Sequence, residues 1–167
     1  MEDGKIWYLT TVYASPLDDR NKKLWMDLTS LTASMDSGCI VGREFNDFLH
    51  LNEKRDGLPT SLRRCTLFQN CTNRCNLLDM GSFGFPLTWR GPVSYRGMRI
   101  YEKLDCVICN NRWRNMYLEA HVKVLHCLEF SDHHTVLLTL MDKDLTKVPK
   151  AFKIECAWLV EPSIEDL

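Results

Sequence analysis

The first forty residues change from a strand-like to a helix-like spacing of apolar positions. Residues 6–13 form a continuous β-branched and aromatic run that ends before Pro16, which predicts a strand followed by a turn. Apolar residues then recur at spacings of three and four, so we expect a helix that ends near Gly38. These residues are Leu24, Trp25, Leu28 and Leu31. The apolar run 39–41 predicts a short buried strand that stops at Gly42.

The rest of the chain continues this mixture of helix and strand patterns. Polar residues predict a surface loop over 50–60, and apolar spacing predicts a helix over 61–78. Leu87-Thr88-Trp89 opens a strand or hairpin whose turn we place around Gly91-Pro92. Further strands are expected over 98–108, 121–128 and 134–141, with a short helical turn over 110–115. Strands mixed with amphipathic helices predict a layered α/β domain.

Composition limits the number of domains and the kinds of partner. A chain of 167 residues that is 45% hydrophobic can bury one core of ordinary size. Its 21 basic and 22 acidic side chains nearly cancel, so contact with a polyanion such as DNA must be local. The main local basic patch is interleaved with aromatic residues, and we interpret it as a solvated face. It comprises Arg90, Arg96, Arg99, Lys103, Arg112 and Arg114, with Trp89, Tyr95, Tyr101 and Trp113.

Cysteine usage and the N-terminal sequence predict the compartment. The chain has eight cysteines, but residues 1–5 lead directly into a strand-like run and show no secretion signal. We therefore expect reduced thiols in an intracellular protein, nuclear or cytoplasmic, that is not secreted. We expect no membrane span either, because no run approaches the roughly 18 apolar residues that one requires.

Two polar segments beside apolar runs carry the candidate chemistry. Gly42-Arg43-Glu44-Phe45-Asn46 follows one buried run, and Ser131-Asp132-His133 precedes another. Each brings acidic, amide or imidazole groups to the end of a predicted strand, which suits metal ligands and a proton acceptor. Each segment alone is also common in solvated loops.

Several segments taken in order resemble a known family. They are residues 9–16, Gly42-Arg43-Glu44-Phe45-Asn46, Glu53-Lys54, Leu87-Thr88-Trp89-Arg90, Leu104-Asp105, Asn111-Arg112-Trp113 and Ser131-Asp132-His133. In order and spacing they resemble the endonuclease domain of non-LTR retrotransposons (LINE-type elements), in the form found in plant reverse-transcriptase polyproteins. The resemblance assigns 1–141 to a partial endonuclease domain. It assigns 142–167 to an extension like the segment that follows the nuclease in such polyproteins.

This family lies in the endonuclease/exonuclease/phosphatase superfamily, and the resemblance implies its fold and chemistry. The implied fold is a partial four-layer α/β sandwich, in which two packed mixed β-sheets are flanked by helices. The implied chemistry is Mg²⁺-assisted attack of water on a DNA phosphodiester, which nicks the strand. Thr88, Arg90 and Arg99 would contact the DNA.

The resemblance also implies a role for each site residue. Tyr13 would place its hydroxyl near the scissile phosphate, and Asn46 would donate an amide hydrogen bond to it. Glu44, where the family has Asp, would orient or deprotonate the attacking water. His133 would stabilise the phosphate or relay a proton, with its ring oriented by Asp105. Asp132 would be a carboxylate ligand of Mg²⁺.

Two departures from the family pattern lead us to expect a degenerate fragment without catalysis. The family's first third, which supplies a metal-binding Glu and an Asn, has no counterpart in this sequence. Glu44 also extends its carboxylate by one methylene, about 1.5 Å, and misplacement near 1 Å can cost roughly a hundredfold in rate. The expected fold therefore lacks the N-terminal strands, and Mg²⁺ binding is expected to be very weak.

Two alternatives stay open from the sequence. One is an active Mg²⁺-dependent endonuclease that another chain completes. The other is a non-catalytic nucleic-acid or zinc-binding module, because Cys106 and Cys109 have the C-x₂-C spacing of zinc ligands. Side chains three apart on a strand point to opposite faces, which argues for buried thiols instead. The other histidines are interpreted as structural or surface residues: His50, His121, His126 and His134.

Overall fold

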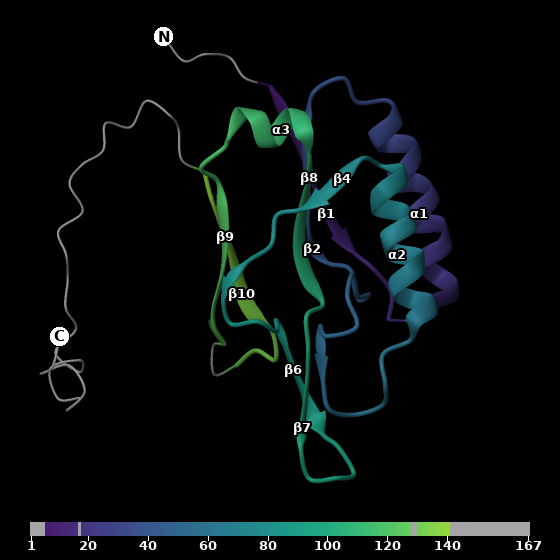
Figure 1. Cartoon of the computed structure of the whole chain (residues 1–167), viewed down its shortest axis with the longest axis vertical. Coiled ribbons are helices and arrows are strands. Elements are labelled where there is room, and N and C mark those ends of the chain that lie inside the picture. The colour runs from purple at the N-terminus through teal and green to yellow at the C-terminus, as the bar shows by residue number, and fades with distance from the viewer. Residues whose placement is uncertain (1–5, 17, 128–129, 141–167) are drawn as a thin grey trace, which may run out of the picture.

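The structure, a computed structural model, describes residues 6–16, 18–127 and 130–140 (Figure 1). The helices are α1 (Asp18–Ala33), α2 (Leu62–Arg74) and α3 (Asn111–Met116). The strands are β1 (Trp7–Tyr13), β2 (Gly38–Glu44), β3 (Lys54–Arg55), β4 (Leu77–Asp79), β5 (Phe83–Gly84), β6 (Trp89–Val93), β7 (Arg99–Glu102), β8 (Asp105–Asn110), β9 (His121–Cys127) and β10 (His134–Thr139).

The principal sheet has the order β1-β2-β8-β4. Strand β1 is parallel to β2, whereas β8 is antiparallel to both of its neighbours, β2 and β4. Helices α1 and α2 cover one face of this sheet, as Figure 1 shows at the right. The core beneath them contains a stack of three rings, in which Trp25 and Phe45 each pack against Phe68. Trp25 and Leu28 of the predicted α1 stripe are buried in this core and Leu24 packs against it, whereas Leu31 is exposed.

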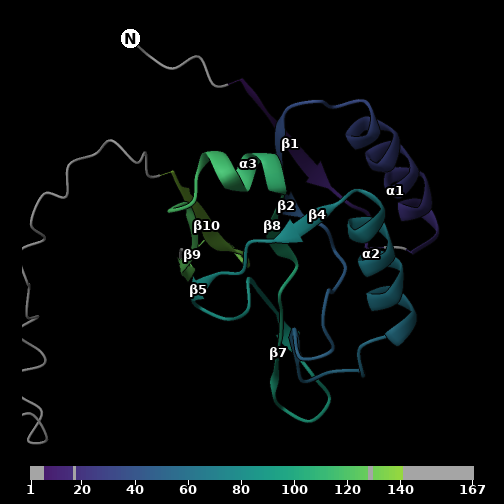
Figure 2. The ribbon, with the colours of Figure 1, turned by 45° about the horizontal axis from the view of Figure 1, so that its top comes forward.

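The second face of the principal sheet packs against a smaller sheet of order β10-β9-β5. Ile40 and Trp113 are completely buried between the two sheets, and α3 closes one end of this layer (Figures 1 and 2). Asn110 caps α3 by accepting a hydrogen bond from Trp113 N at 2.9 Å. The described residues thus form a helix layer and two packed sheets, three of the four layers that the resemblance implies.

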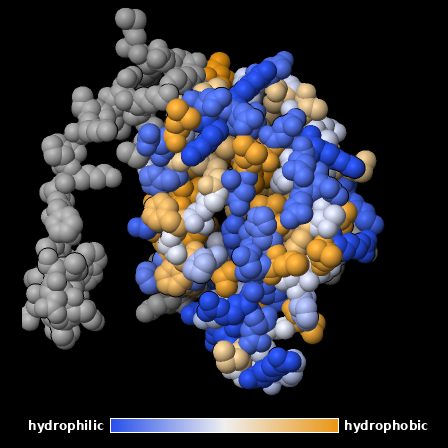
Figure 3. Space-filling model, viewed as in Figure 1, coloured by the Kyte–Doolittle hydropathy of each residue, from blue (hydrophilic) through white to orange (hydrophobic). Residues whose placement is uncertain are grey.

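A third sheet, of order β3-β7-β6, contains a hairpin that projects from the sandwich (Figure 1, bottom). Hydrophilic side chains gather at its tip, as Figure 3 shows. A backbone bridge between Trp89 and His133 ties β6 to the chain that enters β10. This bridge is what brings a distant loop to the end of the principal sheet.

Several elements differ from their sequence predictions at the boundaries. Helix α1 ends at Ala33 instead of near Gly38. Helix α2 ends at Arg74, because Asn76 takes a positive φ of 51° and the next residues enter β4. Strand β2 runs past Gly42 to Glu44, which places that carboxylate on regular sheet structure.

The prediction of one long strand over 98–108 is wrong. Two strands, β7 and β8, occupy this range and belong to different sheets. The hairpin turn lies between Ser94 and Met98, closed by a 2.7 Å hydrogen bond from Ser94 N to Met98 O, and not at Gly91-Pro92. Gly91 and Pro92 instead lie where the β6–β7 register shifts, since proline cannot donate to a regular ladder.

The strands expected over 6–13, 121–128 and 134–141 and the helical turn expected over 110–115 are confirmed to within one or two residues. No helix in the described part of the chain is long and apolar enough to cross a membrane. The segment 142–167, which we predicted to be an extension of the domain, lies outside the described residues.

Candidate functional site

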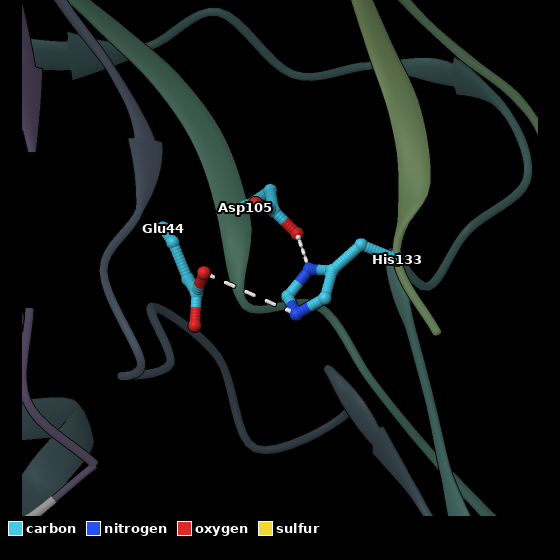
Figure 4. A group of neighbouring side chains, drawn as sticks. All are labelled: Glu44, Asp105 and His133. Atoms are coloured by element: carbon cyan, nitrogen blue, oxygen red, sulfur yellow. Dashed lines mark hydrogen bonds and ion pairs between the residues drawn. The ribbon is translucent and has the colours of Figure 1, made fainter. Parts of the chain in front are cut away.

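Two strands and one loop bring together the candidate site (Figure 4). Glu44 is the last residue of β2 and Asp105 is the first of β8, and the two are direct partners in the antiparallel register. His133 immediately precedes β10 and reaches the same point from the second sheet. Ligand atoms of these three residues lie within 4.8 Å of one another.

The imidazole of His133 lies between the two carboxylates. Its Nδ1 is 2.9 Å from Asp105 Oδ2, and its Nε2 is 4.0 Å from Glu44 Oε2. Because the Asp105 carboxylate accepts from Nδ1–H, the Nε2 atom is directed toward Glu44. All three side chains are partly buried, with 27%, 15% and 11% of their surface exposed for His133, Glu44 and Asp105. This is the geometry of an oriented proton-transfer group beside a second carboxylate.

Thr88 fixes the backbone on which Asp105 and His133 lie. Its hydroxyl accepts hydrogen bonds from Leu104 N at 3.0 Å and Asp105 N at 2.9 Å. Its carbonyl accepts from His134 N at 2.7 Å, so one residue fixes the backbone on both sides of the Asp105–His133 pair. Thr88 is only 1% exposed, and its hydroxyl is therefore not available to the DNA contact that we predicted from the sequence.

Asn46 is also engaged inside the protein. Its side-chain amide donates to Glu44 Oε1 and to Ala14 O, each at 2.8 Å. The residue is buried and has a φ of 51°, a conformation that asparagine adopts more readily than most residues. The amide that we expected to face a phosphate instead orients Glu44 and ties the end of β2 to the end of β1.

Asp132 does not join the cluster, although the sequence made it the candidate Mg²⁺ ligand. Its Oδ2 accepts a hydrogen bond from Trp89 Nε1 at 2.9 Å, and its carbonyl accepts from Arg90 N at 2.7 Å. The indole N–H holds the pKa of Asp132 below its usual value, and the charge of His133 acts in the same direction. The cluster of described residues that could hold a metal ion is Glu44, Asp105 and His133.

The remaining predicted residues lie around the cluster. Tyr13 is the register partner of Glu44 and is 69% exposed, so its ring lies in solvent beside the site. Arg90 and Arg99 are exposed on the projecting hairpin, where Arg99 donates to Gly91 O at 2.9 Å. The basic patch is not continuous, because Arg112 lies on α3 at the other end of the molecule (Figure 1).

The donor set of the cluster fits Mg²⁺ poorly. Mg²⁺ prefers octahedral oxygen ligands, whereas this cluster offers two carboxylates and an imidazole. The Asp105 carboxylate is already bonded to His133, and Glu44 is bonded to Asn46. The site chemistry that the described residues themselves support is proton transfer and hydrogen bonding.

The zinc interpretation of Cys106 and Cys109 is not supported. Cys106 belongs to the core on the α1–α2 side of β8, and Cys109 belongs to the core between the two sheets. Burial raises the pKa of both thiols, to about 11 for Cys109. Within the described ranges neither residue belongs to a group of three possible metal ligands.

Sequence reasoning missed a buried ion pair that supports the site. Glu53 is only 8% exposed, although the sequence predicts a polar surface loop over 50–60. Its carboxylate lies 2.8 Å from Lys103 Nζ and accepts hydrogen bonds from Leu49 N and His50 N at 2.7 and 3.0 Å. The Glu-Lys pattern at 53–54 belonged to the family resemblance, but nothing in it indicated a buried partner fifty residues later.

Solved structures that resemble this chain include an endonuclease domain and a toxin. The endonuclease domain of TRAS1, a telomere-specific non-LTR retrotransposon, matches with a TM-score of 0.59 and 14% sequence identity, over 82% of this chain and 56% of that one. Beta toxin 275-280 from Staphylococcus aureus matches with a TM-score of 0.54 and 14% identity, over 84% of this chain and 55% of that one. The chain has the fold of these proteins. It spans about half the length of each.

This likeness confirms the predicted fold class, α/β with several mixed β-sheets packed with helices. No protein-family model and no curated protein sequence matches the chain. At 14% identity the likeness concerns the fold and assigns no role to any residue of the site.

Proposed function

We propose that this chain is an endonuclease-like domain of retrotransposon type that lacks nuclease activity when it acts alone. The observation that carries the proposal is the contrast within the site. The proton-transfer group is assembled at 2.9 Å, while the carboxylate predicted to hold Mg²⁺ is bonded to an indole. The fold shared with the TRAS1 endonuclease domain supports DNA as the substrate class.

The chemistry of the site explains why a metal would be needed for cleavage. Hydrolysis of a phosphodiester develops negative charge on the phosphate, which an enzyme must stabilise by donors or cations. Glu44 and Asp105 bring negative charge to the same place, and His133 is the one cationic or donor group among the three cluster residues. Without a bound divalent ion, the cluster repels the phosphate more than it stabilises the transition state.

The test is nicking of supercoiled plasmid DNA by the purified chain in Mg²⁺ buffer. We expect no nicking above the level of His133→Asn, with His121→Asn as a matched control because His121 lies on β9 outside the cluster. Titration calorimetry with Mg²⁺ alone should give no specific heat. Nicking that requires Mg²⁺, persists in His121→Asn and disappears in His133→Asn would overturn the proposal.

One observation favours a second candidate, an active Mg²⁺-dependent endonuclease completed by another polypeptide. The Asp105–His133–Glu44 arrangement is intact, with the imidazole oriented as proton transfer requires. In this case Asp105 orients His133, and His133 Nε2 donates to a phosphate oxygen. The probe is the part of the TRAS1 domain outside the match, expressed separately. Nicking that appears only in the mixture and is lost in His133→Asn supports this candidate.

An intracellular location and a plant LINE-type origin belong to the same proposal. Six cysteines in the described part of the chain are buried free thiols: Cys39, Cys65, Cys71, Cys75, Cys106 and Cys109. Free thiols in this number are typical of a reducing compartment.

A further inference from the structure

Two of the sheet edges have unusual composition. Natural sheets protect their edges with short strands, charged side chains or proline, because unpaired edges recruit other strands. Four edges in the described part of the chain follow this rule. Strands β3 and β5 have two residues each, β4 has three residues and ends in Asp79, and β6 contains Arg90 and Pro92.

The edges formed by β1 and β10 do not follow it. Strand β1 has seven residues and β10 has six, and neither contains proline, lysine, arginine or a carboxylate. Strand β1 is the end of the principal sheet and β10 is the end of the smaller one. Large apolar side chains on or next to these strands are exposed: Ile6 72%, Tyr8 46%, Leu9 59%, Tyr13 69% and Leu137 45%.

Both open edges lie on the same side of the sandwich. Trp7 of β1 and Val136 and Leu138 of β10 pack against the same buried core. The opposite ends of the two sheets are β4 and β5, which follow one another in the chain with three residues between them. A single partner could therefore contact β1 and β10 together.

The hydrogen-bonding groups of β1 divide cleanly between its two sides. Ala14 N donates to Glu44 O at 2.9 Å, so the backbone groups of alternate residues before it, Val12 and Thr10, also face β2. The N–H and C=O groups of Leu9, Thr11 and Tyr13 consequently point to the open edge. Another β-strand fits this edge, because a strand supplies donors and acceptors in the same period.

We propose that this partner is a second copy of the chain, paired antiparallel along β1 about a twofold axis. Such a contact is isologous and closes, since each β1 strand meets the same strand of its partner. Self-pairing brings no like charges together, because β1 carries none. The exposed parts of Ile6, Tyr8, Leu9 and Tyr13, at roughly 200 Å² for a full side chain, supply about 500 Å² on each copy. The two copies together therefore approach the about 1,000 Å² of a stable interface before β10 is counted.

The variant that tests this geometry is Thr11→Pro. It removes an outward N–H and leaves the groups that bond to β2 intact, a position at which an edge strand tolerates proline. Thr11→Ala is the matched control, because it removes the same side chain and keeps the N–H. We expect sedimentation equilibrium to show a dimer for the natural chain and for Thr11→Ala, and at least a tenfold weaker association for Thr11→Pro.

Hydrogen exchange of the natural chain provides a readout that does not depend on a variant. The amides of Leu9, Thr11 and Tyr13 should become protected as the protein concentration rises, while those of Thr10 and Val12 should be protected throughout. A chain that is still monomeric at about 100 μM, roughly a hundred times a dimer dissociation constant near 1 μM, overturns the proposal. Open-ended polymers, or a dimer that forms equally well in Thr11→Pro, also overturn it.

Discussion

The buried pair between Glu53 and Lys103 provides the sharpest stability prediction. Lys103 Nζ lies 2.8 Å from Glu53 Oε1 and 3.2 Å from Asp79 Oδ2. The two side chains of the pair are only 13% and 9% exposed, and Lys103 N donates to Glu53 O at 2.8 Å. The pair therefore clamps the loop after β2 to the junction between β7 and β8, two residues before Asp105.

Glu53→Gln is the perturbation, because it removes the charge and keeps the shape. Loss of one partner from a buried ion pair typically costs about 3–5 kcal/mol. Asp79 remains beside Lys103, and the amide oxygen of glutamine can still accept from Leu49 N and His50 N. We therefore expect a loss of about 2–3 kcal/mol in the free energy of unfolding.

The pH dependence of this difference gives a second test. Burial alone would lower the pKa of Lys103, but the hydrogen bond and charge of Glu53, together with Asp79, outweigh it and raise the pKa above the usual 10.5. A raised folded pKa stabilises the protein fully below the unfolded value and loses that effect as pH rises through the folded value. The difference between the natural chain and Glu53→Gln should stay constant from about pH 7 to 9 and shrink above 10.5.

Urea denaturation followed by circular dichroism measures both effects. Asp36→Asn is the control, since Asp36 and Arg112 are 3.7 Å apart and fully or largely exposed, and it should leave the midpoint unchanged. The reasoning is refuted if Glu53→Gln costs less than about 1 kcal/mol, or if its effect grows at high pH.

Three further predictions concern the site and the core. Thr88→Val should cost about 2–3 kcal/mol in urea denaturation, because two buried N–H groups lose their acceptor, whereas an unchanged midpoint would contradict the role of Thr88. Phe68→Ala should cost about 3–5 kcal/mol by the same assay, since Phe68 is completely buried in the ring stack. Asp132→Asn should alter tryptophan fluorescence, because Asp132 accepts a hydrogen bond from Trp89. It should also remove a small stabilisation that is present above pH 3.8 and lost as pH falls below it. Identical stability–pH profiles for the natural chain and the variant would exclude the Trp89 contact.

Local sequence patterns predict the elements of this fold well where one period applies over a whole segment. The uninterrupted run in β1 and the stripe of α1 both fold as predicted. The pattern fails over 98–108, where apolar spacing continues although the chain passes from one sheet to another at Lys103. Periodicity records which positions are buried and not which sheet buries them, so such a transition cannot be read from it.

For the site, the sequence predicted which residues come together but not all of the contacts that they make. Family resemblance located Glu44, Asp105 and His133, and the structure brings these three together. It did not predict that Asp132 bonds to Trp89 or that Asn46 bonds to Glu44. These contacts depend on side-chain orientation at strand ends, and the polarity of a residue does not specify its orientation.

A short segment at the start of β6 determines the state of the whole site. Thr88 fixes the backbone of Asp105 and His134, while Trp89 binds the Asp132 carboxylate and Arg90 N binds the Asp132 carbonyl. The same three residues therefore assemble the proton-transfer group and withhold the nearby carboxylate from it. Replacing the indole would free only the carboxylate, because the backbone bond to Arg90 remains. Trp89→Phe should thus free the Asp132 carboxylate without separating His133 from Asp105, and titration calorimetry of this variant with Mg²⁺ tests whether Asp132 can hold the ion.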